Sequence, residues 1–76
     1  MELVINLQDI SKVKKFISVV NTFESDIDII RGLYVIDAKS AMGVFTIDLS
    51  EPVHIYVHSD DKSELERFLK EMEAFK

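Results

Sequence analysis

The chain has 76 residues, a length at which we expect residues 1–76 to form a single domain around one small core. It contains no cysteine, which excludes a disulfide framework, a thiolate metal site and thiol catalysis. Asp and Glu number 14 against 9 Lys and Arg, and a surface so acidic repels the phosphates of nucleic acid.

The first two expected elements differ in the period of their apolar residues. Leu3, Ile5 and Leu7 recur at every second position, which predicts a strand with one core face. From residue 9 the period becomes helical and predicts a helix that ends near residue 23. Its apolar stripe consists of Ile10, Val13, Phe16, Ile17, Val20 and Phe23. Asp9 is the expected N-cap, since its carboxylate accepts hydrogen bonds from free backbone N–H groups.

The middle of the chain is typical of a hairpin followed by a short helix. Two runs rich in β-branched residues, 26–31 and 33–37, flank Gly32 and predict a tight or bulged turn there. A short helix is expected after Ser40, with the serine hydroxyl as its N-cap on the N–H of Met42 or Gly43. Residues 49–52 read as a turn, and 53–58 alternate again as a strand.

The last element is an amphipathic helix. Asp61 and Glu64 have the spacing of a capping box at its start. Its apolar face consists of Leu65, Phe68, Leu69, Met72 and Phe75.

The order β-α-β-β-α-β-α predicts an α+β open-faced β-sandwich, a four-stranded antiparallel sheet with its helices on one face. The other face stays open to water. By strand parity we expect this open face to carry several apolar residues: Val4, Ile30, Tyr34, Ile36 and Tyr56. A partner or a second copy of the chain is one interpretation of such a face, and scattered exposed residues without consequence are the other.

No apolar run approaches the roughly 20 residues of a membrane span. Residues 1–4 also lack the basic start of a signal peptide. The expectation is a cytoplasmic protein without membrane insertion.

Three features of the chain are similar to HPr, the small phosphocarrier protein of the bacterial phosphoenolpyruvate:sugar phosphotransferase system. The segment Lys39-Ser40-Ala41-Met42-Gly43-Val44 resembles the Lys-Ser-Ile-Met-Gly-Val segment of that family and is the most specific of the three. The segment Phe23-Glu24-Ser25-Asp26-Ile27 resembles the end of the family's first helix, and the C-terminal helix matches the element that closes the domain. The resemblance implies the same open-faced sandwich, a non-enzymatic role in sugar transport or carbon catabolite regulation, and no cofactor or metal.

The same resemblance exposes a loss. Counted back from Phe23 at the family's spacing, Asp9 stands where the phosphoryl-accepting His is expected, Ser11 where an Arg is expected and Lys12 where a Pro is expected. The carrier reaction needs a neutral imidazole nitrogen as nucleophile at a helix N-terminus that receives the phosphoryl oxygens. A carboxylate is a poor acceptor without a metal and further acids, so we predict that carrier activity is absent.

The resemblance keeps the regulatory serine. It implies that Ser40 is phosphorylated by the ATP-dependent HPr kinase, and that the phosphoserine form docks on the catabolite control protein, a transcription regulator. Lys39, Ala41, Met42 and Phe45 match the residues that bind partners there. The alternative for the apolar ones is ordinary packing of a short helix against the rim of the sheet.

His54 and His58 fall on the same side of the predicted strand 53–58, with Tyr56 between them. At about 3.3 Å per residue they lie some 13 to 14 Å apart, too far to share a metal ion. A solvated or interface face is the interpretation that we adopt for them.

Two further functions stay open at this point. The chain is either a phosphocarrier that uses a non-standard acceptor, Asp9 or a histidine, or an inactive paralogue that serves as a structural or assembly domain and forms a homodimer. Phosphotransferase-system enzymes are the partners implied for the first, and a second copy or a partner enzyme for the last.

Overall fold

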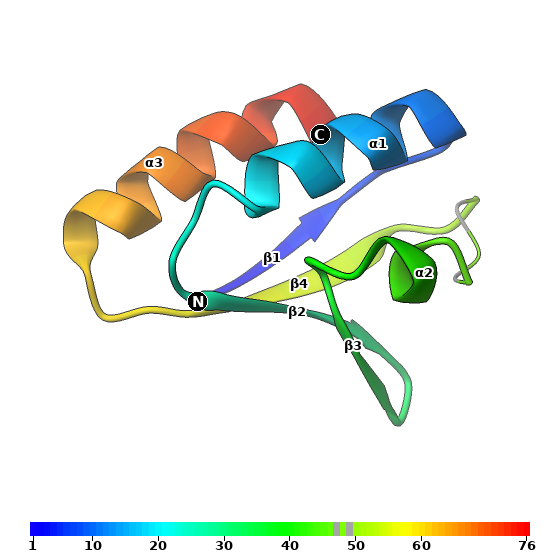
Figure 1. The fold of residues 1–76 in the computed structure, drawn as a ribbon, viewed down its shortest axis with the longest axis horizontal. Coiled ribbons are helices and arrows are strands. Elements are labelled where there is room, and N and C mark those ends of the chain that lie inside the picture. The colour runs from blue at the N-terminus through cyan, green and yellow to red at the C-terminus, as the bar shows by residue number, and fades with distance from the viewer. Residues whose placement is uncertain (47, 49) are drawn as a thin grey trace.

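The structure is a computed structural model that describes residues 1–46, 48 and 50–76. Within these residues the elements follow one another as β1 (Glu2–Ile5), α1 (Ile10–Val20), β2 (Asp26–Arg31), β3 (Tyr34–Asp37), α2 (Ala41–Val44), β4 (Val53–His58), α3 (Lys62–Met72) and the 3₁₀ turn η1 (Glu73–Phe75). The strands form one sheet in the order β1-β4-β2-β3, and each neighbouring pair is antiparallel (Figure 1).

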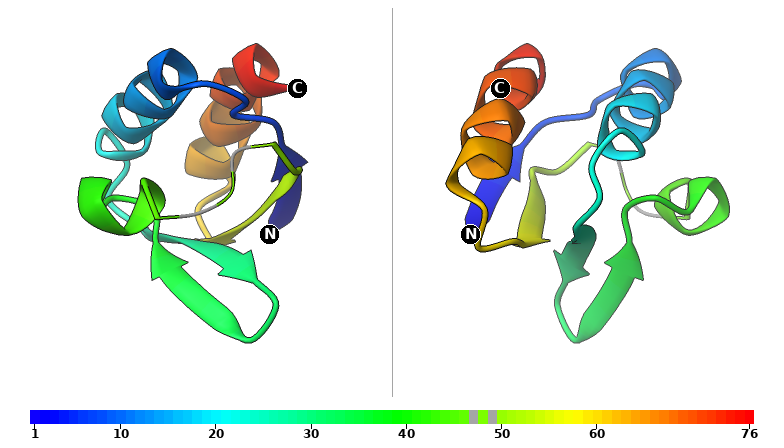
Figure 2. Two further views of the ribbon diagram at one scale, coloured as in Figure 1. Left: turned by 90° about the vertical axis from the view of Figure 1, so that its right-hand side faces the viewer. Right: turned by 60° about the vertical axis from the view of Figure 1, so that its left-hand side comes forward.

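Helices α1 and α3 lie over one face of the sheet, and α2 lies at its edge beside β3 (Figure 2). The core fills the space between these layers. Its largest fully buried side chains include Phe16, Phe68, Phe75, Ile5, Leu7, Ile27, Ile29, Ile55 and Met72. The α+β open-faced sandwich with helices on one face is therefore confirmed. None of the helices in the described residues has the length and apolarity to cross a bilayer.

The two long helices bury narrower stripes than the sequence predicts. In α1, Val13, Phe16 and Val20 are buried, whereas Ile10 is 58% exposed. In α3, Leu69 is 42% exposed. The residues that stay buried in each helix are spaced by three or four positions, and an additional apolar neighbour falls outside the line of contact with the sheet.

Helix α1 ends at Val20, three residues before the predicted end. Polar side chains account for this, because the Asn21 amide donates to the Ile17 carbonyl at 2.8 Å and the Thr22 hydroxyl donates to the Val19 carbonyl at 2.7 Å. The Val19 carbonyl, which the Phe23 N–H would pair with in a longer helix, is thus satisfied by Thr22, and the Ile17 carbonyl also accepts from the Asn21 N–H at 3.2 Å. Phe23 remains buried, and its ring packs edge-on against Phe68 with centroids 5.5 Å apart.

The β2–β3 hairpin corrects one expectation about the open face. Gly32 has φ +59°, which suits the first central position of a two-residue turn, and Arg31 pairs directly with Tyr34. Consequently Ile36 pairs with Ile29, which is buried against the helices. Residues paired across a sheet share a face. Tyr34 and Ile36 therefore lie on the helix side, and their predicted placement on the open face is wrong.

Helix α3 is fastened to the loop between α1 and β2 through its first turn. Asp61 caps the helix by accepting from the backbone N–H groups of Ser63 at 2.9 Å and Glu64 at 3.3 Å. The Glu64 carboxylate does not close a capping box: it accepts hydrogen bonds from the Ser25 hydroxyl and, at 3.3 Å, from the Glu24 N–H. The capping role of Asp61 is confirmed, and that of Glu64 is replaced by a long-range contact.

Glu64 is expected to make stability depend on acidity. The hydrogen bond from the Ser25 hydroxyl, followed by one from Ser59, holds the pKa of the Glu64 carboxyl below its usual value. A depressed pKa in the folded state stabilises the fold above the unfolded-state pKa, and this contribution disappears as the pH falls through the folded-state value. In urea unfolding monitored between about pH 6 and pH 3, Glu64→Gln should be less stable than the parent at the upper end and should lose less stability on acidification.

Glu66→Gln is the matched control, because Glu66 lies exposed on the same helix. It should follow the parent profile. Superimposable profiles for Glu64→Gln and Glu66→Gln would show that the contact with Ser25 carries no such linkage.

Candidate functional site

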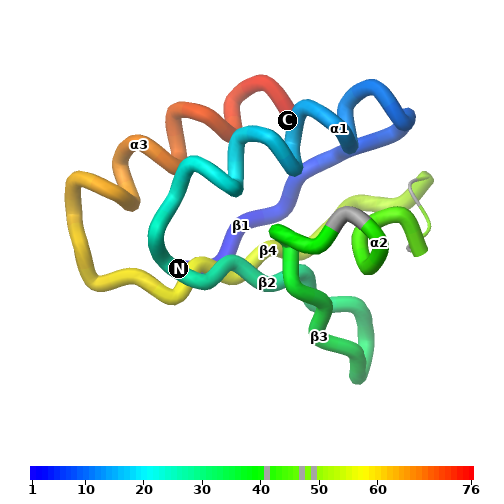
Figure 3. The backbone as a smooth tube through the Cα atoms, viewed as in Figure 1, coloured from blue at the N-terminus to red at the C-terminus, as the bar shows by residue number. Residues whose placement is uncertain are grey.

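The first candidate position is the start of α1. After β1 the chain crosses from the sheet to the helix layer, and Asp9 caps the start of α1 there (Figure 3). The Asp9 Oδ1 accepts a hydrogen bond from the Lys12 N–H at 2.8 Å, so the predicted N-cap is confirmed. Gln8 precedes it with φ +57°, and the Lys12 ammonium donates to the Gln8 side-chain carbonyl at 3.5 Å.

This geometry bears directly on phosphoryl transfer. A helix N-terminus receives an anion through its free N–H groups and its partial positive charge. Here the carboxylate of Asp9 already occupies that position and bonds to one of those N–H groups. An incoming phosphoryl group would meet a fixed negative charge instead of an imidazole nucleophile. Both histidines of the chain lie on β4.

The cap can be separated from the charge by two substitutions. Asp9→Ala removes the acceptor for the Lys12 N–H, and loss of such a cap costs about 1 kcal/mol of unfolding free energy. Asp9→Asn keeps an oxygen acceptor and should lie close to the parent. Urea unfolding of the three proteins measures the difference. If Asp9→Ala were as stable as Asp9→Asn, the contact seen at the start of α1 would have no energetic weight.

The second candidate position is Ser40, at the start of α2. Its hydroxyl oxygen accepts from the Gly43 N–H at 3.4 Å, and its carbonyl accepts from the Val44 N–H at 3.1 Å. The predicted capping of Gly43 is thus present. Its own N–H donates to the Asp37 carbonyl at 3.0 Å, which fixes the turn from β3 into the helix. Ser40 is half-buried, so the hydroxyl lies at the surface of a fixed turn.

The predicted partner-binding residues differ in their surroundings. Met42 is 85% exposed and Phe45 is 43% exposed, whereas Val44 is fully buried and anchors the helix. The Lys39 ammonium donates to the Phe23 carbonyl at 2.7 Å, so it ties α2 to the loop after α1 instead of standing free beside Ser40. The side chain of Ala41 lies outside the described part of the chain.

Gly43 is required for α2 to pack against β3. A Cβ atom at this position would lie 2.9 Å from Cγ2 of Ile36, closer than side chains tolerate. The glycine of the Ser40 segment therefore lets the short helix approach the edge strand. Ile36 in turn contacts the main core, so the position of Ser40 depends on the packing of the sheet.

Gly43→Ala should destabilise the protein by about 1 kcal/mol, because overpacking outweighs the gain in helix propensity. In an Ile36→Ala background, which removes Cγ2, the same substitution should be neutral or stabilising. Urea unfolding of the two single variants and the double variant gives the coupling between the sites. Additive effects would mean that the close approach of Gly43 to Ile36 does not limit packing.

The third candidate position is the pair of histidines. Nε2 of His58 lies 2.6 Å from Oδ2 of Asp28, and Nδ1 of His54 lies 3.6 Å from Oε1 of Glu2. The His58 and Tyr56 rings have centroids 4.7 Å apart. Both histidines lie on the open face of the sheet, as predicted, and each has its own carboxylate neighbour. In the described residues no group of His, Asp and Glu side chains has the geometry of a metal site.

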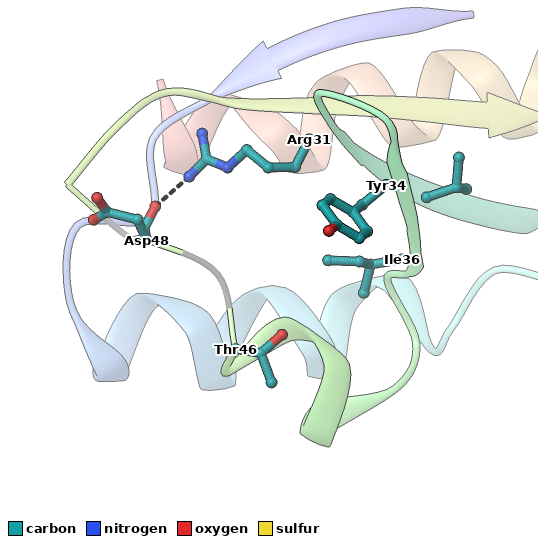
Figure 4. A pocket seen from close by; sticks show the side chains of 6 residues that line it. Arg31, Tyr34, Ile36, Thr46 and Asp48 are labelled. Atoms are coloured by element: carbon teal, nitrogen blue, oxygen red, sulfur yellow. Dashed lines mark hydrogen bonds between the residues drawn. The ribbon is translucent and has the colours of Figure 1, made fainter.

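Sequence reasoning missed the role of Arg31. Its guanidinium donates to the Asp48 carbonyl (Figure 4) and, at 3.1 Å, to the Glu51 carboxylate. A shallow hollow of about 410 Å³ lies beside it, lined by Arg31, Tyr34, Val35, Ile36, Thr46 and Asp48. The sequence feature that could have revealed this role is an arginine at a position of β2 that faces the helices. These contacts tie β2 to the connection between α2 and β4.

Asp48 contributes to the same connection. The Ser50 hydroxyl donates to its carboxylate at 2.7 Å and the Ser50 N–H does so at 2.9 Å. The hydroxyl bond is the main reason why the pKa of the Asp48 carboxyl lies below its usual value. The turn predicted at residues 49–52 includes Leu49, which lies outside the described residues.

Comparison with protein families places the chain among phosphotransferase-system proteins. The family model described as the PTS HPr component phosphorylation site matches residues 11–76. The matched range includes Ser40 and begins after Asp9. Among curated proteins, no significant match to the chain is found.

Several solved structures share the fold. HPr-C-His from Thermoanaerobacter tengcongensis has a TM-score of 0.74 and 18% identity, covering 97% of this chain and 92% of its own. The phosphocarrier protein HPr from Bacillus anthracis str. Ames has a TM-score of 0.74 and 18% identity, covering 100% and 96%. The catabolite repression containing protein Crh from Bacillus subtilis, an intertwined dimer with a swapped domain, has a TM-score of 0.65 and 22% identity, covering 97% and 87%.

Proposed function

The chain belongs to the HPr family of the phosphotransferase system, and from this premise we propose that it is a regulatory binding module whose signal is phosphorylation of Ser40. In this proposal it does not carry phosphate on histidine. The observation that carries the proposal is the contrast between its two helix starts. The start of α1 is closed by the Asp9 carboxylate, whereas Ser40 presents a hydroxyl beside the exposed side chains of Met42 and Phe45.

The chemistry of the family supports the negative half of this proposal. HPr proteins are phosphocarriers rather than enzymes, and a carrier needs a nucleophile that accepts and releases a phosphoryl group. Asp9 uses its carboxylate as a helix cap. His54 and His58 lie on a sheet face beside Glu2 and Asp28, whose negative charges disfavour approach of a phosphoryl donor.

The surroundings of Ser40 support the positive half. A phosphate there adds about −1.5 to −2 charges and three acceptor oxygens. The Gly43 N–H, now bonded weakly to the hydroxyl at 3.4 Å, is within the same turn and is available to a phosphate oxygen. Because Val44 and Gly43 hold α2 against the sheet, the modification changes the surface around Met42 and leaves the fold intact. A protein partner, such as the catabolite control protein of the family, would bind to that surface.

The test is incubation of the purified protein with ATP and the HPr kinase of the same host, followed by intact mass measurement. One added phosphate is expected on the parent protein. Ser40→Ala should remain unmodified, and Ser63→Ala should be modified like the parent, since Ser63 is an exposed serine in the first turn of α3. Absence of phosphate from the parent, or phosphate retained by Ser40→Ala, would refute the assignment of Ser40.

A second arm addresses the carrier function. The protein is incubated with phosphoenolpyruvate and enzyme I. One portion of the products is kept at alkaline pH, where phosphohistidine survives, and a second is measured at once near neutral pH, because alkali hydrolyses an aspartyl phosphate. No phosphate should be transferred, while a histidine-containing HPr included as a positive control becomes labelled. Labelling that disappears in Asp9→Asn, His54→Gln or His58→Gln would identify a non-standard acceptor and overturn the proposal.

A further inference from the structure

The open face of the sheet is organised in rows that run across the strands. The registers place Val4, His54, Ile30 and Val35 in one row, Glu2, Tyr56, Asp28 and Asp37 in the next, and His58 and Asp26 in the third. Successive rows are separated by two residues along each strand, about 7 Å. One end of the face is therefore mainly apolar, and the other end is acidic.

The carboxylates of the face outnumber its basic groups, which are His54 beside Glu2 and His58 beside Asp28. Glu2, Asp26, Asp28 and Asp37 contribute four carboxylates, and the strand residues of this face, all of which the structure describes, include neither Lys nor Arg. The basic residues of the chain lie on the helices, the loops and the helix side of β2: Lys12, Lys14, Lys15, Arg31, Lys39, Lys62, Arg67, Lys70 and Lys76. The fold thus separates the cations from this group of carboxylates.

The apolar row is accessible. Val35 is 67% exposed and Val4 is 47% exposed, and they lie on the two edge strands with Ile30 and His54 between them. In the acidic rows, Asp26, Asp28, Asp37 and His58 line a shallow depression of about 450 Å³. The face thus has an apolar row at one end and acidic rows at the other. Such a face suits a partner segment with apolar residues at one end and basic residues at the other.

We propose that this open face binds a basic segment of another protein, with the apolar residues of the segment over the row of Val4, Ile30 and Val35 and its Lys or Arg residues over the acidic rows. Charge complementarity selects a cationic partner and repels nucleic acid and anionic membranes. A metal ion does not fit, since no group of these side chains among the described residues has the geometry of a metal site. The proposal is independent of Ser40.

A synthetic peptide provides the test. It carries one leucine and then two lysines at alternate positions separated by serines, so that an extended backbone places one of these side chains over each of the three rows. Titration into the ¹⁵N-labelled full chain at low salt should shift the amide signals of β2, β3 and β4, with Asp26, Asp28 and Asp37 among the largest. A peptide with glutamate in place of lysine should produce no shifts.

Matched charge variants distinguish a site from general attraction. Asp26→Asn with Asp37→Asn should weaken peptide binding by roughly fivefold, because two exposed ion pairs are lost. Glu66→Gln with Glu71→Gln removes the same charge from α3 and should leave the affinity unchanged. Val35→Ser should weaken binding without changing its salt dependence. Ser40→Ala should bind like the parent.

Three outcomes with the peptide would overturn the proposal: no shifts with the lysine peptide, shifts centred on α3, or equal weakening by the two double variants. A titration with Mg²⁺ alone is run in parallel. If Mg²⁺ shifts the same amides and abolishes peptide binding at millimolar concentration, the face is a cation site and the assignment to a protein segment is wrong.

Discussion

The separation of the two faces of the sheet is the constraint on which the rest of the structure depends. It is clearest in β4, where Val53, Ile55 and Val57 are buried and the three residues that alternate with them are exposed. A shift of register by one residue would exchange these sets and place the imidazoles in the core. The pairing of β4 with both β1 and β2 fixes the register, so core and open face are determined together.

The helix layer uses its termini differently from what a carrier requires. At α1 the carboxylate of Asp9 is part of the fold, because it bonds to the backbone of the helix that it begins. At α2 the hydroxyl of Ser40 makes only a long contact with Gly43, while the helix is held mainly by Val44 and by the close approach to Ile36. A phosphoryl group added to the Ser40 hydroxyl would therefore break little that stabilises the fold. The same chemistry at position 9 would have to displace a structural bond.

Local patterns were sufficient to predict the element order, the sheet with helices on one face and three of the caps. Local patterns gave wrong or incomplete predictions where a turn sets which face of the sheet a residue occupies, or where a side chain binds a residue distant in the sequence. The two-residue turn at Gly32 sets the parity of β3, and its length was not evident from two adjacent apolar runs, so Tyr34 and Ile36 were assigned to the wrong face. Glu64 has the spacing of a capping box, but it binds Ser25, which lies 39 positions earlier in the chain. Arg31 bonds to Asp48 and Glu51, which lie in a loop whose position relative to β2 cannot be predicted from the periodicity of apolar residues.

The two candidate surfaces differ in position and in the kind of signal that they use. Met42 lies in α2 and Phe45 directly after it, at the edge of the sheet beside β3, whereas the acidic rows lie on the face of the sheet turned away from the helices (Figure 2). In the proposed function Ser40 gains its charge by phosphorylation, whereas the sheet face carries the carboxylates of Glu2, Asp26, Asp28 and Asp37 without any modification. Taken together, the two proposals describe one partner that binds through the carboxylates of the sheet face and a second that responds to a phosphate on Ser40.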